Sequence, residues 1–173
     1  MRIYTAISRL LDYPNQELMD NLEDISLLVK DEPVLSALDC SEVIKVIDWM
    51  ADQKLLELQE KYVATFDHGQ ETSLHLTHHL FGEEDRERGP AMINLGEHYK
   101  KAGLQSVKGE LPDYLPLILE YISTLNDGEA GPFLGDAAEG ITILADNLDK
   151  EKSPYAALVR VLERHGQPYR KAA

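Results

Sequence analysis

The chain has 173 residues, of which 43% are hydrophobic, so it is long enough to form one globular domain with a full core. It carries 31 acidic residues against 17 lysines and arginines, a formal charge of −14. That balance argues against binding to nucleic acid or to anionic lipid, and it favours a cationic partner such as a basic peptide. The single cysteine, Cys40, rules out an internal disulfide and a four-cysteine zinc site.

The apolar residues follow a helical period along almost the whole chain. Short polar stretches, among them "DHGQET", "SVKG" and "GPFLGD", are predicted to be loops or turns between the helices. The predicted helices cover roughly residues 3–11, 15–30, 41–50, 52–66, 73–81, 90–103, 113–126, 136–149 and 154–165.

Residues that favour helix ends support these boundaries. Ser41 and Ser153 are predicted N-caps, because a serine hydroxyl accepts a hydrogen bond from the first turn of a helix. Pro90 suits a first turn, Gly103 suits the left-handed stop after a last turn, and Gly166 is predicted to end the last helix.

No alternating strand pattern and no repeat of fixed length is visible in the sequence. Because the loops are short, neighbouring helices are expected to pack antiparallel. The sequence therefore predicts an all-α fold, a single domain over residues 1–173 with about eight to nine helices. The start, "MRIYTAISRLLDYP", lacks the architecture of a signal peptide, and no apolar run approaches the ~20 residues that span a bilayer, so we expect a cytoplasmic protein without membrane insertion.

The stretch "ELPDYLPLILEY" is the first candidate site. Asp113 is placed to cap the helix that follows, Pro116 falls in its first turn, and Pro112 holds the entering residue extended. A well-made helix start therefore accounts for these residues, and a functional carboxylate at Asp113 remains the alternative.

The stretch "HLTHH" places His75, His78 and His79 at i, i+3 and i+4, so that in a helix they share one face. Such spacing binds zinc or copper in some proteins, but Leu76 stands where a metalloprotease needs glutamate. Polar histidines on an ordinary helix explain the same pattern, and we predict no metal site.

Two further stretches contain candidate binding residues. In "EKYVATFDHG", Tyr62 and Phe66 are spaced to pack together in the core, and Asp67 at the helix end favours a cationic partner. In "DRERGPAM", Arg86 and Arg88 are basic islands in an acidic chain. No glycine-rich phosphate loop and no nucleophile elbow accompanies them, so the chemistry of the sequence does not indicate an enzyme.

These motifs together resemble a known family. The span "YVATFDHGQETSLHLTHHLFGEEDRERGPAMINLGEHYKKAGLQSVKGELPDYLPLILEYISTL", residues 62–125, is similar to the centre of the NarJ group of nitrate reductase assembly chaperones, within the TorD/DmsD/NarJ family of redox-enzyme maturation chaperones. The opening "SRLLDYP" also resembles the start of that family. The combination of "FDHG", "DRERG" and "ELPDYLP" carries the resemblance.

The resemblance implies a TorD-like helical fold and a chaperone rather than an enzyme. It implies a partner, the N-terminal segment of the catalytic (alpha) subunit of nitrate reductase, which is bound while molybdenum cofactor is inserted. No cofactor is expected to stay on the chaperone itself. The resemblance is compatible with a monomer or a homodimer, because helices of this family exchange between chains.

The same resemblance suggests which residues meet the client peptide. An incoming helix would lay its apolar face on aromatic and leucine side chains in a groove, and its basic residues would meet Asp67 and Asp113. Tyr114 stands where many relatives have histidine. The candidate peptide-binding residues are Tyr62, Phe66, Asp67, Arg88, Pro112, Asp113, Tyr114, Pro116 and Tyr121.

Two alternatives from other functional classes are compatible with the sequence. One is a protein that handles a metal or a nucleotide through His75, His78 and His79 or through Arg86 and Arg88. The other is a helical adaptor for an unrelated partner.

Overall fold

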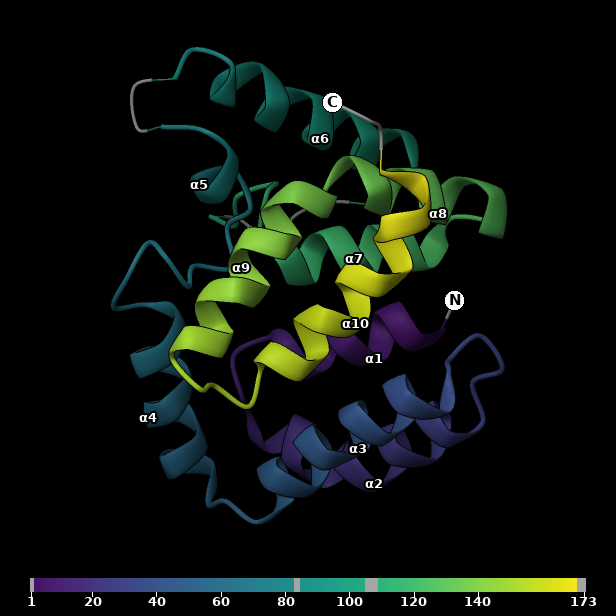
Figure 1. Ribbon diagram of the computed structural model, residues 1–173, viewed down its shortest axis with the longest axis vertical. Coiled ribbons are helices and arrows are strands. Elements are labelled where there is room, and N and C mark those ends of the chain that lie inside the picture. The colour runs from purple at the N-terminus through teal and green to yellow at the C-terminus, as the bar shows by residue number, and fades with distance from the viewer. Residues whose placement is uncertain (1, 83–84, 105–108, 171–173) are drawn as a thin grey trace.

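The computed structural model describes residues 2–82, 85–104 and 109–170, and in these residues the protein is built from α-helices (Figure 1). The predicted all-α class is confirmed. The predicted loop "SVKG" falls outside the described residues except for Gly109. The helices are α1 (Arg2–Leu11), α2 (Gln16–Lys30), α3 (Ala37–Ala51), α4 (Leu55–Phe66), α5 (Thr77–Leu80), α6 (Arg88–Lys101), α7 (Leu115–Thr124), α8 (Asp127–Asp136), α9 (Ala138–Lys150) and α10 (Ala156–Gly166), followed by the 3-10 turn η1 (Gln167–Tyr169).

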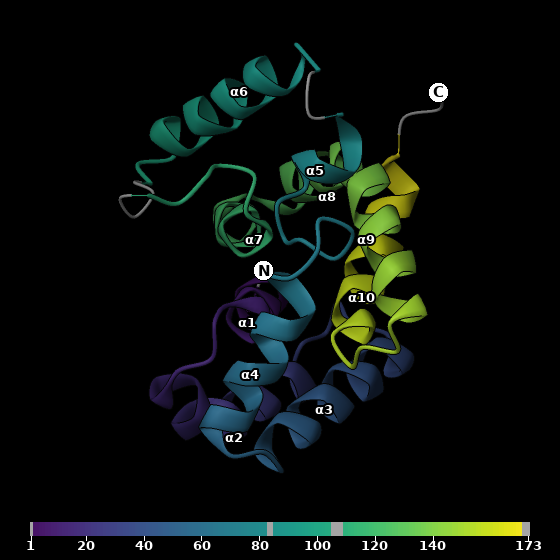
Figure 2. The same cartoon turned by 90° about the vertical axis from the view of Figure 1, so that its left-hand side faces the viewer.

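The helices pack in pairs around a common core (Figures 1 and 2). Helix α1 lies along α7, α2 lies along α3, and α9 lies along α10, which also contacts α3 and α8. Figure 2 shows α6 at one end of the molecule, set apart from α7 and from the rest of the bundle. This arrangement leaves one side of α6 facing α5, α7 and α8.

Apolar side chains from nine of the helices form one continuous core cluster. The largest side chains that are fully enclosed include Tyr4, Leu10, Leu119, Leu134 and Tyr155. Each fully buried leucine of this kind contributes about 1.5–3 kcal/mol relative to exposure, so the paired helices are held by their apolar faces. Helix α6 differs from the paired helices, because Tyr99 is the one buried residue among its described residues.

Helix ends follow the predicted chemistry in part. Gly103 adopts the left-handed conformation, with φ of 74°, just after α6 as predicted. Ser41 is not a cap: α3 begins at Ala37, and the Ser36 hydroxyl accepts a hydrogen bond from the amide of Asp39 at 3.0 Å. Ser36 rather than Ser41 caps α3, because Asp39, three residues after Ser36, also accepts a hydrogen bond from the Ser36 hydroxyl at 2.6 Å.

Helix α8 occupies the stretch that was predicted to be a turn, and it is why the described residues hold ten α-helices rather than the expected eight to nine. Asn126 caps it by accepting the amide of Gly128 at 3.0 Å, and Leu134 is fully buried. Its glycines serve packing rather than a turn: a Cβ on Gly135 would lie 2.6 Å from the backbone oxygen of Tyr169. The glycines therefore let η1 sit directly on α8.

Among the described residues, no helix combines the length and the apolar character that crossing a bilayer requires.

Candidate functional site

Asp113 lies in the segment just before α7 and is the most enclosed charged residue of the motif region, with 0% of its surface exposed. Its carboxylate accepts hydrogen bonds from the Thr77 amide at 3.2 Å and from the Thr77 hydroxyl, and it lies 3.1 Å from Nδ1 of His75. Burial raises the pKa of Asp113, but the hydrogen bonds from His75 and Thr77 outweigh it and hold that pKa below its ordinary value. The group is therefore an enclosed, ionised carboxylate.

The backbone around Asp113 is tied to the same segment. The amide of Leu76 donates to the carbonyl of Asp113 at 3.0 Å, and the amide of Leu115 donates to the carbonyl of Leu74 at 2.8 Å. An isolated antiparallel bridge joins His75 and Tyr114. We call the contacts between residues 74–77 and 113–115 the Asp113 clasp.

The clasp corrects the predicted role of Asp113 as the cap of its own helix. Helix α7 begins at Leu115, its N-cap is Tyr114, and no side chain caps it. The carboxylate instead accepts the amide at the start of α5, 36 residues earlier in the chain. Proline at the start of α7 makes a side-chain cap less necessary, because Pro116 has no amide hydrogen to satisfy.

The histidines do not share one helical face as predicted, because α5 covers only Thr77–Leu80 and His75 precedes it. His75 faces Asp113, whereas Nε2 of His79 lies 2.8 Å from the carbonyl of Ser73. Burial lowers the pKa of both His78 and His79. No cluster of three metal-ligating side chains occurs in the part of the chain that the structure describes.

Tyr62 and Tyr114 belong to a chain of hydroxyl contacts inside the bundle. The Tyr62 hydroxyl donates to the carbonyl of Leu11 at 3.1 Å and lies 3.0 Å from the Tyr114 hydroxyl, which donates to Asp12 at 3.0 Å. This chain links the end of α1 with α4 and with the start of α7. Tyr114 therefore has a hydrogen-bond partner in Asp12.

The aromatic pair predicted for peptide contact lies in the core. Tyr62 is 4% exposed and Phe66 is 5% exposed, and their rings are 4.8 Å apart. Pro116 is buried as well, and its carbonyl accepts a hydrogen bond from Ser8 at 2.8 Å. Asp67, by contrast, is exposed at the end of α4, on a shallow hollow that it shares with His75 and His78.

Three other motif residues hold α6 in place. Nε of Arg88 donates to the Thr77 hydroxyl at 3.0 Å, which joins the start of α6 to the Asp113 clasp. The Tyr99 hydroxyl donates to the carbonyl of Pro112 at 2.6 Å, and the Tyr121 ring lies 5.3 Å from the Tyr99 ring. Arg88, Pro112 and Tyr121 therefore secure α6 at both ends of its inner face.

The space under α6 is a mostly apolar cleft of about 320 Å³, which we call the α6 cleft. Its walls come from α5, α6, α7 and α8 and the start of α9, and the buried Asp113 and the exposed Asp136 are among its lining residues. The apolar lining residues are Leu76, Leu80, Phe81, Ala91, Leu95, Ile118, Phe133 and Ala137.

Sequence reasoning found the residues that frame the α6 cleft but missed most of those that line it. Leu95 and Phe133 lie on helices whose apolar faces are weak in the sequence, and α8 was predicted to be a turn. No apolar pattern in the sequence marks these residues as a group, because they come from separate helices and meet only in the fold.

Comparison with known proteins points to the same family as the sequence motifs. The family described as "Nitrate reductase delta subunit" matches residues 35–172. A probable nitrate reductase molybdenum cofactor assembly chaperone, NarW of Escherichia coli K12, is 36% identical over 163 residues, which cover 94% of this chain and 67% of that protein. The assembly chaperone NarJ of the same strain is 35% identical over 156 residues, covering 90% of this chain and 66% of NarJ.

A probable NarJ of Bacillus subtilis 168 is 32% identical over 159 residues, which cover 92% of this chain and 85% of that protein. The chain thus spans about two thirds of the length of the two E. coli relatives and most of the Bacillus one.

Proposed function

The chain belongs to the nitrate reductase delta subunit family, and on that premise we propose that it is a non-catalytic assembly chaperone of nitrate reductase. Its client is the N-terminal segment of the catalytic subunit, held while molybdenum cofactor is inserted. The names of the relatives support the class of function, and the α6 cleft supports the mode of binding.

The observation that carries this proposal is the α6 cleft itself. An amphipathic helix binds by laying its apolar side chains into an apolar groove, and this cleft offers leucine, isoleucine and phenylalanine walls. The formal charge of −14 attracts a basic segment, and the exposed Asp136 lies beside the apolar walls.

The motif residues then act in two ways. Asp113 is fully enclosed, so we propose that it acts by fixing Thr77, and through Thr77 the position of Arg88 and α6, rather than by touching the client. Pro112 and Tyr121 support the other end of α6. Asp67 remains a proposed contact for a basic side chain, because it is exposed.

The helices that form the α6 cleft are supported from inside the bundle by Tyr62, Phe66, Tyr114 and Pro116. Their burial and hydrogen bonds position the helices that carry the cleft.

Calorimetric titration with a synthetic peptide of the client's N-terminal segment tests the proposal. Leu80→Gln places an amide in the cleft wall, where an unpaired polar group costs about 1–3 kcal/mol, so we expect affinity to fall about tenfold or more. Leu56→Gln is the matched control, because Leu56 is a 67% exposed leucine on α4 that does not line the cleft.

Equal affinity of Leu80→Gln and wild type would place the peptide elsewhere on the protein. No binding of the peptide by the wild-type chain, together with normal nitrate reductase activity in cells that lack the chain, would overturn the function itself.

A further inference from the structure

Helix α8 forms one wall of the α6 cleft, although its sequence is a poor helix former. Three glycines and Pro132 fall within its 10 residues, and isolated helices shorter than ~12–15 residues are marginal even when they contain good helix formers. Phe133 lines the cleft, and its ring lies 5.5 Å from His98 on α6 and 4.9 Å from Tyr121 on α7. The cleft wall therefore depends on what packs against α8.

The 3-10 turn η1 lies against the glycines of α8, and Figure 1 shows the end of α10, in yellow, beside this helix. A Cβ on Gly131 would overlap the ring of Tyr169, and a Cβ on Gly135 would lie 2.6 Å from the backbone oxygen of Tyr169. Gly131 and Gly135 share one face of the helix, because they are at i and i+4. Phe133 lies about 200° round the helix from each of them. Helix α8 is therefore held between η1 on one face and the α6 cleft on the other.

Helix α10 fixes the position of η1, because both of its ends are tied to other helices. At its start, Tyr155 is 1% exposed, and its ring packs 5.3 Å from Trp49 and 4.9 Å from Phe66. Near its end, a guanidinium nitrogen of Arg164 lies 2.6 Å from the carboxylate of Asp39 on α3. Since η1 follows α10 directly, these contacts bring Tyr169 to the glycines of α8.

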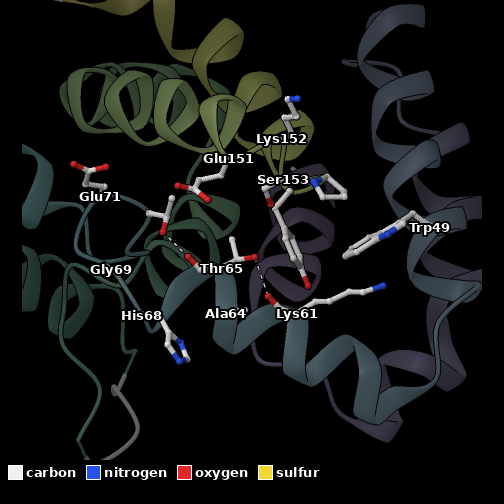
Figure 3. A pocket seen from close by; sticks show the side chains of 13 residues that line it. Trp49, Lys61, Ala64, Thr65, His68, Gly69, Glu71, Glu151, Lys152 and Ser153 are labelled. Carbon is white, nitrogen blue, oxygen red and sulfur yellow. Dashed lines mark hydrogen bonds between the residues drawn. The ribbon is translucent and has the colours of Figure 1, made fainter.

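The start of α10 differs from the sequence prediction that Ser153 is its N-cap. That prediction is wrong, because the N-cap is Tyr155 and no side chain caps the helix. Lys152, with φ of 53°, turns the chain out of α9, and Ser153 lines a hollow of about 560 Å³ beside α4 (Figure 3). Packing of the Tyr155 ring, rather than a cap, therefore fixes the start of α10.

We propose that η1 (Gln167–Tyr169) is a strap that holds α8 in the form that binds the client, and that release of this strap lowers the affinity of the α6 cleft. Tyr169 is then a positioning residue, because none of the described residues that line the cleft belongs to η1. Tyr169 is 48% exposed, so undocking the strap exposes less surface than displacing a core residue would. The identity of the client rests on the proposed function, whereas the effect of the strap on α8 does not.

Amide hydrogen exchange tests the strap without any client. Tyr169→Ala removes the ring, and we expect the amides of α8 to exchange about tenfold faster while those of α2 keep their wild-type rates. Tyr169→Phe keeps the ring that covers Gly131 and should exchange as wild type does. Unchanged exchange at α8, or equally faster exchange at α2 and α8, would overturn the proposal.

Titration with the synthetic peptide of the client's N-terminal segment tests the effect on the cleft. We expect Tyr169→Ala to bind about tenfold more weakly, which corresponds to a binding-competent α8 in about one molecule of ten. Gly135→Ala should weaken the peptide to a similar extent, although alanine is the better helix former, because its Cβ displaces the backbone of Tyr169. Since both substitutions act on one contact, the double variant should bind about as well as either single variant.

Tyr13→Ala is the matched control, because Tyr13 is a 47% exposed tyrosine that packs on another aromatic ring and lies outside α8 and the α6 cleft. It should bind the peptide as wild type does. Wild-type affinity in Tyr169→Ala or in Gly135→Ala, or additive losses in the double variant, would overturn the coupling of η1 to the cleft. Failure of the wild-type chain to bind the peptide would instead overturn the proposed function, and hydrogen exchange would still decide whether η1 holds α8.

Discussion

Replacing Asp113 tests the clasp that holds α5, α6 and α7 together. Asparagine keeps the shape of the side chain but loses the charge that faces His75, and its amide group cannot accept the hydrogen bonds that both carboxylate oxygens now receive. A hydrogen bond to a charged group contributes about 1.5–3 kcal/mol, so we expect Asp113→Asn to lower the free energy of unfolding by about 2 kcal/mol. Asp113→Ala leaves Thr77 and His75 without an acceptor, and we expect a loss of about 3–5 kcal/mol.

The charge of Asp113 also gives this effect a definite pH dependence. Its pKa in the fold lies below the ordinary value of 3.8, so the carboxylate stabilises the protein above that value and the stabilisation is lost as pH falls through the lower folded pKa. The difference between wild type and Asp113→Asn should therefore shrink as the pH falls below this ordinary pKa of Asp113.

Urea unfolding followed by circular dichroism at several pH values measures both quantities. Asp24→Asn is the control, because Asp24 is exposed on α2, and it should change the free energy of unfolding by less than about 0.5 kcal/mol. If Asp113→Asn were as stable as this control at neutral pH, the clasp would not be a stabilising element, and the route proposed from Asp113 through Thr77 to α6 would fail.

Two further predictions concern packing. Gly135→Ala should lower the melting temperature by several degrees, because the new Cβ would lie 2.6 Å from the backbone oxygen of Tyr169. Gly96→Ala, with nothing within 4 Å of the new Cβ, should instead stabilise α6 by about 0.5–1 kcal/mol. Thermal melting should show shifts of opposite sign for the two variants, and shifts of the same sign would contradict the close contact of η1 with α8. Tyr62→Ala and Phe66→Ala should both destabilise the fold by about 3–5 kcal/mol, since both rings are buried. If either variant melts like wild type, that ring is not a core residue.

The local features of the helices could be read from the sequence. The apolar spacing of α2 and α10 and the left-handed stop at Gly103 depend on neighbours within a few residues, so the pattern alone predicts them. The choice between Ser36 and Ser41 as the cap of α3 was missed, although Asp39, three residues after Ser36, was a local signal for it.

What the sequence could not determine is which distant segments meet. Asp113 sits where a helix cap is expected, and its carboxylate nevertheless accepts the amide of Thr77 in α5, while no side chain caps α7. The glycines of α8 indicate a turn until η1 is seen lying on them, since tertiary contact stabilises a helix that local propensity disfavours. The α6 cleft likewise exists only because helices far apart in the chain leave space between them. Hydrogen bonding and hydrophobic burial act over a few ångströms in space, whatever the separation along the chain, and only the tertiary structure decides which residues come within that distance.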